Sequence, residues 1–161
     1  MADHELHVVE ESDLPELLPL MRGYCDFYEV DTPDEDLLSV SRSLIADHDA
    51  EGLQLLARSG EDGHAIGFAT IFWSWSTLSA SRIGVMNDLF VTADARGSGV
   101  AEALISECVE RCRRRGGVKS LEWQTAKDNL RAQTLYDRVG GRRSEWLDYS
   151  LEVRGPAHEA R

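Results

Sequence analysis

The stretch from Met86 to Cys112 places a strand pattern, a glycine-rich turn and a helix pattern one after another without a gap. The run 83–91 is apolar and rich in β-branched residues, as expected of a largely buried strand. The helical part carries one apolar stripe at helical spacing, made of Ala101, Leu104, Ile105, Cys108, Val109 and Cys112. The stretch therefore predicts a strand that leads through a tight turn into an amphipathic helix.

The four residues from Arg96 to Gly99, hereafter the glycine turn, read Arg-Gly-Ser-Gly. Glycine permits positive φ and leaves room for a ligand beside the backbone. Amide groups at a helix start, together with the helix dipole and an arginine, favour phosphate binding. No Gly-Lys-Ser/Thr follows and the three-glycine dinucleotide spacing is missing. On these residues alone, a pyrophosphate site and an ordinary glycine turn both fit.

The length of 161 residues fits one domain, which can bury about 70% of the surface of its unfolded chain. We expect a single domain over 1–161, with a core over about 6–153 and a loose tail over 154–161. Three cysteines without a CxxC pair argue against a disulfide framework. Cys108 and Cys112 lie four residues apart among apolar residues, which favours core packing over metal binding. No metal is predicted.

Charge narrows the possible partners. The chain has 29 acidic and 17 basic residues and a formal charge of −12, so nucleic acid is not an expected partner. A cationic substrate would be attracted, although the charge could serve solubility alone. The apolar runs are too short to cross a bilayer and the N-terminal residues lack a signal-peptide pattern. We therefore expect no membrane association and a cytoplasmic location.

Alternation and helical spacing predict the remaining elements. Strands are expected over 6–10, 53–58, 65–75, 83–91, 121–125 and 146–153. Besides the helix after the glycine turn, helices are expected from Leu14 towards Tyr28, from Pro33 to about 47, and over 129–139. Asp13 with Glu16 is placed to cap the first of these helices, and Thr32 with Glu35 to cap the second.

Two blocks resemble one enzyme family. Arg96-x-x-Gly99-x-Ala101, after a strand and at the start of a helix, resembles the pyrophosphate loop of the GCN5-related N-acetyltransferases (GNAT). The block 129–140 is similar to that family's later helix, in which an Asn and a Tyr seven residues on face the cofactor. The resemblance covers 8–153. It implies an α/β fold with a mixed, mostly antiparallel sheet of six to seven strands and about four helices, and a homodimer.

The same resemblance implies an acetyl-CoA-dependent N-acetyltransferase without a metal. Asp88 is expected to be the base that deprotonates the amine, directly or through water, and Tyr136 the acid that protonates the leaving thiolate. From the residues alone, Asp88 could instead cap backbone N–H groups at a strand end, and Tyr136 could simply pack on a helix face. The residues expected to bind acetyl-CoA are Leu89, Phe90, Val91, Arg96, Gly97, Ser98, Gly99, Val100, Ala101 and Asn129.

The spermidine/spermine and thialysine acetyltransferases are the nearest subgroup. Where they carry two acids, two aromatics and a valine, this chain reads Asn87-Asp88-Leu89-Phe90-Val91, so one acid expected to hold a polyamine is replaced. The expected acceptor is a small cationic primary amine that attacks directly in a ternary complex. A protein lysine or N-terminal amine, or a non-catalytic acyl-CoA sensor, are the alternatives. The residues expected around the acceptor are Tyr24, Asp26, Tyr28, Glu29, Asn87 and Glu145.

Overall fold

The computed structural model describes residues 4–153, and the chain forms two compact units, residues 1–127 and 128–161. The predicted tail over 154–161 lies outside the described residues. Within these residues, no helix is long and apolar enough to cross a membrane.

The first unit is built on one five-stranded sheet in the order β1-β2-β3-β4-β5. The strands are β1 (His4–Val8), β2 (Gly52–Ser59), β3 (Ala65–Ser76), β4 (Ser81–Val91) and β5 (Val118–Glu122). The first four pair antiparallel in chain order, and β5 pairs parallel to β4. This confirms the predicted parallel relation between the strands on either side of the long helix.

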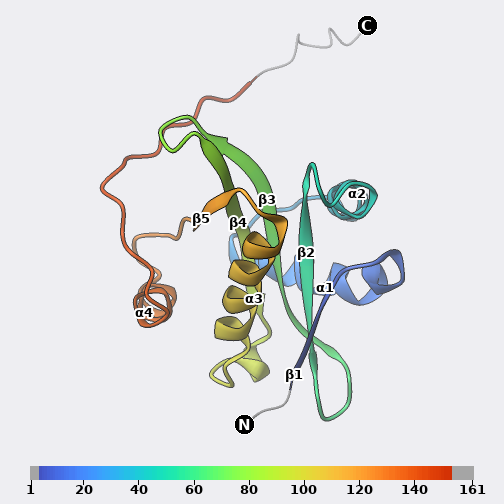
Figure 1. Ribbon diagram of the computed structural model, residues 1–161. Coiled ribbons are helices and arrows are strands. Elements are labelled where there is room, and N and C mark those ends of the chain that lie inside the picture. Colours follow the sequence, from blue (N-terminus) through green and yellow to red (C-terminus); the bar gives the residue numbers. More distant parts are fainter. Residues whose placement is uncertain (1–3, 154–161) are drawn as a thin grey trace, which may run out of the picture. The chain divides into compact units, whose positions relative to one another are not determined.

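Three helices pack on this sheet, α1 (Leu14–Phe27), α2 (Asp34–Ala46) and α3 (Val100–Arg115). Short 3₁₀ turns precede α1 (Glu11–Asp13) and follow β4 (Ala93–Ala95). In Figure 1, α3 lies in front of the strands along β4 and β5.

Opposite faces of the sheet meet different helices. Phe68 of β3 contacts the Tyr24 ring of α1, with centroids 6.1 Å apart. Gly84 of β4 faces α3 so closely that a Cβ there would lie 2.8 Å from the Sγ of Cys112. Alternation along each strand thus sends one set of side chains to α1 and the other to α3.

The core between α1, α2 and the sheet is apolar, consisting of Val9, Leu14, Leu17, Leu20, Met21, Cys25, Leu37, Leu56 and Phe68. On the other face, Cys108 and Cys112 of α3 are buried, as predicted for core residues. Burial raises the pKa of the Cys108 thiol far above its usual range, so this side chain is inert packing.

The predicted helix caps are wrong in both cases. Asp13 accepts a hydrogen bond from the Glu10 backbone N–H at 2.9 Å and so closes the turn before α1, while Glu16 pairs with Arg58 at 2.7 Å. α2 begins at Asp34, with Pro33 as its cap residue, so Thr32 does not cap it. Asp13 does occupy the N-cap position of α1, but its side chain makes no cap hydrogen bond. Arg58, which is distant in the sequence, pairs with both carboxylates, at 3.0 Å from Asp13 and 2.7 Å from Glu16, and sequence spacing does not reveal this pairing.

The sheet has five strands, not the predicted six to seven, because residues 146–153 form no strand. Their apolar side chains are exposed, namely Trp146, Leu147, Tyr149, Leu151 and Val153. Alternation of apolar and polar residues predicts that a segment could join a sheet, but a strand forms only where another strand pairs with it. Because strand bounds depend on the pairing partner, β1 lies two residues earlier in the sequence than predicted, and β5 lies three residues earlier.

The second unit contains the predicted helix near the C-terminus, α4 (Leu130–Arg138). The Asn129 side-chain oxygen caps it by accepting from the Ala132 N–H at 3.2 Å. Gly140, with φ of 86°, follows the helix end, and Arg143 pairs with Asp137 at 2.7 Å.

Candidate active site

A β-bulge interrupts β4 near its middle. Thr70 of β3 lies opposite Asp88, whereas Ile71 lies opposite Met86, so Asn87 is an extra residue on β4. A bulge bends the strand and changes the direction of the side chains next to it. The bulge therefore sets the positions of Asn87 and Asp88.

Beyond the bulge, β4 and β5 part. Their ladder runs from Arg82, opposite Val118, to Val85, opposite Glu122, and stops there. Residues 86–91 thus keep a backbone edge that β5 does not pair with, which suits hydrogen bonds to an extended amide chain. This is the edge that contains Leu89, Phe90 and Val91, as the resemblance implies for the pantetheine arm. The Val91 carbonyl also accepts from Arg96 Nε at 3.0 Å.

The glycine turn has the backbone of an anion site. Gly97 and Gly99 have φ of 87° and 91°, and a Cβ on either would meet no described heavy atom within 4 Å. Ser98 Oγ donates to the Ala95 carbonyl at 2.6 Å and closes the turn. Gly99 is the cap residue of α3, and no described side chain caps that helix. The first amides of α3, at Val100 and Ala101, thus have no side-chain partner among the described residues, as the prediction of a pyrophosphate site requires.

Asp88 is partly buried and is surrounded by polar side chains. Burial raises the pKa of its carboxyl, while the side chains of Thr70 and Asn87 and the nearby Tyr24 hydroxyl act to lower it, with a net increase. Asn87 Nδ2 donates to Asp88 Oδ1 at 2.9 Å. All these donors are side chains, which disfavours the alternative that Asp88 caps backbone N–H groups.

Aromatic rings link Asp88 to the C-terminal end of α1. The Tyr24 hydroxyl donates to the Asn87 carbonyl at 3.2 Å, and its ring meets Tyr28 edge-on at 5.1 Å. The Phe27 ring lies 5.0 Å from the Tyr28 ring, centroid to centroid, and Phe27 is exposed. The structure thus brings Tyr24 and Asn87 together beside Asp88, with Tyr28 packed against Tyr24.

Two predicted acidic residues lie at the same end of α1. Asp26 is exposed in the last turn, and its carbonyl accepts the Glu29 N–H at 3.1 Å. Glu29 has φ of 56°, a left-handed conformation that ends the helix. Its exposed carboxylate, like that of Asp26, is available to a cation arriving from solvent.

Tyr136, Asn129 and Glu145 belong to the second unit. Tyr136 is partly exposed on α4, seven residues after Asn129, and Glu145 is exposed in the segment after the helix. The roles of these three residues stay predictions.

Sequence reasoning missed two polar side chains beside Asp88. Gln54 of β2 and Thr70 of β3 are buried on the same face of the sheet and hydrogen-bonded to each other at 3.1 Å. A usable signal was present, because each interrupts an apolar strand at a position where a buried residue is expected.

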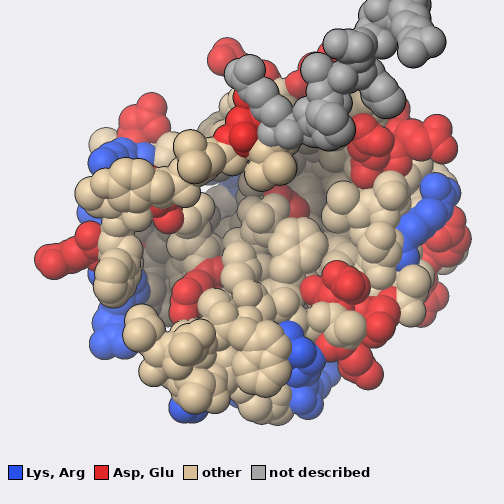
Figure 2. Space-filling model, turned by 90° about the horizontal axis from the view of Figure 1, so that it is seen from above, with Lys and Arg blue, Asp and Glu red and all other residues tan. Residues whose placement is uncertain are grey.

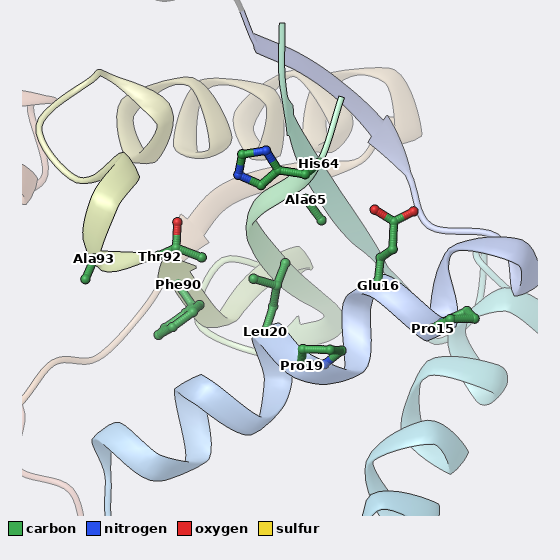
Figure 3. A pocket seen from close by; sticks show the side chains of 9 residues that line it. All are labelled: Pro15, Glu16, Pro19, Leu20, His64, Ala65, Phe90, Thr92 and Ala93. Atoms are coloured by element: carbon green, nitrogen blue, oxygen red, sulfur yellow. The ribbon is translucent and has the colours of Figure 1, made fainter. Parts of the chain in front are cut away.

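An open pocket of about 520 Å³ lies between α1 and the end of β4. Figure 3 shows Pro19 and Leu20 of α1 on one side and Phe90 and Thr92 on the other, with His64 nearby. Phe90 lines this pocket and also belongs to the edge of β4 that β5 does not pair with. The sequence did not predict this pocket.

Among the described residues, no three His, Cys, Asp or Glu side chains are grouped closely enough to hold a metal ion. The polar groups that the site offers are therefore backbone amides, hydroxyls and single carboxylates.

Comparisons with known proteins agree with this geometry. The model of the acetyltransferase (GNAT) family matches residues 17–141. An uncharacterized N-acetyltransferase of Bacillus subtilis, YhfO, is 31% identical over 129 residues, which are 80% of this chain and 83% of that protein. The D-amino-acid N-acetyltransferase HPA3 of Saccharomyces cerevisiae is 38% identical over 84 residues, 52% of each chain.

The fold agrees as well. The solved structure of the aminoglycoside N-acetyltransferase AAC(6')-Iy in complex with CoA has a TM-score of 0.81 at 19% identity, over 94% of this chain and 96% of that one. By the family match and the similarity to these relatives, the chain belongs to the GNAT family and is an acetyl-CoA-dependent N-acetyltransferase.

Proposed function

We propose that the enzyme acetylates a primary amine of a small cationic molecule, such as a polyamine, a diamine or a lysine-like compound. The observation that carries the proposal is the partly buried carboxyl of Asp88, whose pKa burial raises, next to Tyr24 in the aromatic end of α1. A free alkyl ammonium has a pKa of about 10.4, so a base has to remove a proton before the nitrogen can attack.

Asp88, Tyr136 and the glycine turn have separate roles in the proposed reaction. Bound acetyl-CoA supplies the acetyl group as a thioester. Asp88 accepts a proton from the ammonium, and its raised pKa makes it a stronger base than an exposed carboxylate. The neutral amine then attacks the thioester carbonyl carbon directly, the C–S bond breaks, and Tyr136 donates its proton to the departing sulfur. The second proton that the nitrogen loses as the amide forms restores the Tyr136 hydroxyl. The amides of the glycine turn hold the pyrophosphate throughout.

Charge supports a cationic acceptor. The chain carries a net charge of −12, and Figure 2 shows acidic side chains forming the larger charged patches on the face seen there. At the end of α1, the rings of Tyr24 and Tyr28 offer cation–π contacts, and Asp26 and Glu29 offer ion pairs.

The name of the yeast relative gives D-amino acids as the acceptors of that protein. A D-amino acid is zwitterionic, so a site for it would also have to bind a carboxylate. The basic side chain near this end of α1 is Arg22, which is already paired with Asp34 and lies 4.0 Å from Asp31. This pairing favours an acceptor that carries positive charge only. Basic peptides remain the competing acceptor class.

A thiol-release assay tests the proposal. Acetyl-CoA is offered with spermidine, diamines, lysine analogues, aminoglycosides, D-amino acids and a basic peptide. We expect turnover with small polycations and a loss of at least 100-fold in Asp88→Asn. Turnover restricted to D-amino acids or to the peptide would refute the acceptor class.

We also propose a homodimer, which light scattering would detect as twice the mass of one chain. A monomer at assay concentrations would contradict this part of the proposal and leave the chemistry intact.

A further inference from the structure

Three polar side chains lie side by side across the sheet, on the face covered by α1. Gln54 of β2 is opposite Thr70 of β3, and Thr70 is opposite Asp88 of β4. We call this row the polar ladder. Gln54 is 2% exposed and Thr70 is fully buried, and Gln54 Nε2 donates to Thr70 Oγ1 at 3.1 Å.

In the polar ladder, each side chain is placed to donate a hydrogen bond to the next one, from Gln54 through Thr70 to Asp88. The Thr70 oxygen accepts from Gln54, so its single hydrogen is available to Asp88. An ionised carboxylate only accepts hydrogen bonds, so a hydroxyl directed at Asp88 from the opposite position on β3 favours the ionised form and lowers the pKa of that carboxyl. If the Gln54 amide were rotated so that its Oε1 faced Thr70, the Thr70 hydroxyl would donate to Gln54 and would no longer be available to Asp88.

Core packing alone does not explain Gln54. Its Oε1 is buried and has no hydrogen-bond partner among the described residues. An unpaired buried oxygen costs stability, and an apolar side chain of the same size would avoid that cost. The amide is therefore better explained by what its Nε2 does for Thr70.

We propose that Gln54 and Thr70 are positioning residues, with Gln54 fixing the direction of the Thr70 hydroxyl and Thr70 holding the Asp88 carboxylate ionised and oriented for the acceptor amine. This rests on the proposed function, because it requires Asp88 to be the base.

The surroundings of Asp88 make the proposal testable by titration. The groups that face it are Thr70 from β3, Tyr24 from α1 and Asn87 on its own strand, and none of them is charged at neutral pH. Within the described part of the chain, the charge state of Asp88 thus depends on burial and hydrogen bonds instead of an ion pair. Loss of one hydrogen bond is then not masked by a neighbouring charge.

The experiment uses two variants that remove the polar groups at nearly constant volume, Thr70→Val and Gln54→Met. Thr70→Ser retains the hydroxyl and serves as the rescue variant. Ser41→Ala is the matched control, because Ser41 is equally buried but hydrogen-bonds to Met21 Sδ on α1. Carbon-13 NMR of the Asp88 carboxyl, assigned with Asp88→Asn, gives the titration midpoint, and steady-state kinetics give the pH profile of kcat/KM.

We expect the NMR midpoint of Asp88 to move to higher pH in Thr70→Val and Gln54→Met, and to stay at the wild-type value in Thr70→Ser and Ser41→Ala. In the two polar deletions, kcat/KM should fall about tenfold on the acid side and recover at high pH, since one hydrogen bond to a charged group is lost. The KM for acetyl-CoA should change less than about twofold.

An unchanged midpoint in both deletions, or an equal shift in Ser41→Ala, would overturn the positioning role while leaving Asp88 as the base. A shifted midpoint without a matching shift in kcat/KM would show that Asp88 is not the base, and the proposed function would fail together with the positioning role. If Thr70→Val does not fold, Gln54→Met carries the same test.

Discussion

Gly99 offers the sharpest test of the phosphate-binding turn. It has φ of 91° and ψ of 0°, immediately precedes α3, and would place a Cβ in open space. An alanine there therefore clashes with no described atom of the protein, but it adds a methyl group beside the amides that are expected to hold the pyrophosphate.

The structure separates two effects of Gly99→Ala. A left-handed conformation costs an L residue about 1–2 kcal/mol, and alanine regains part of this by restricting the unfolded chain, so the net loss of stability should be about 1 kcal/mol. Binding should suffer more. Loss of one amide-to-phosphate hydrogen bond should raise the Kd for acetyl-CoA about tenfold, or 1.4 kcal/mol.

Gly63 provides the matched control. It lies in the turn between β2 and β3, has φ of 75°, and a Cβ on it would also meet no described atom within 4 Å. Gly63→Ala should lose similar stability in urea denaturation and keep the wild-type Kd in calorimetry. If both variants weaken acetyl-CoA binding equally, or if neither does, the assignment of the glycine turn is refuted.

The remaining predictions concern the chemistry and the packing. Asp88→Asn should abolish turnover while leaving the calorimetric Kd for acetyl-CoA within about twofold, and a large loss of binding would instead indicate misfolding. Because burial raises the pKa of Asp88 above its unfolded value, this carboxyl destabilises the native state as pH rises through that window, so Asp88→Asn should unfold at higher urea than wild type at pH 8 and show no such gain at pH 3. Tyr136→Phe should lower kcat with little change in the KM for acetyl-CoA, and an unchanged kcat would exclude it as the acid. Gly84→Ala should cost about 1–3 kcal/mol in urea denaturation because the new Cβ would lie 2.8 Å from Cys112 Sγ, and Cys112→Ala should relieve part of that cost in the double variant.

The elements that local sequence determines were predicted well. The strand, turn and helix around the glycine turn follow from alternation, glycine and helical spacing within one short stretch, and β4 and α3 match the expected ranges closely. The same holds for β2, β3 and α4, whose bounds agree within one or two residues. Features that depend on distant pairing were not predicted, including the ion pairs of Asp13 and Glu16 with Arg58.

Residues 146–153 show the limit of pattern reasoning for strands. Their alternation is that of a strand, yet they pair with nothing in the sheet of residues 4–122. Periodicity reports which side chains could share a face, but the hydrogen bonds that make a strand come from a partner elsewhere in the chain.

The candidate site shows the same distinction between features set by local sequence and features that depend on distant pairing. Asp88 could be named from the sequence because it lies three residues before the end of the strand that precedes the glycine turn, where the resemblance implies that acyl-CoA binds. Gln54 and Thr70 could not, because their position beside Asp88 depends on the register of three strands and on one bulge at Asn87. Without that bulge, a one-residue shift would turn Asp88 to the α3 face, away from Thr70 and Tyr24. The bulge therefore couples the fold to the chemistry, since it places the carboxyl, its hydroxyl donor and the aromatic end of α1 on one face of the sheet.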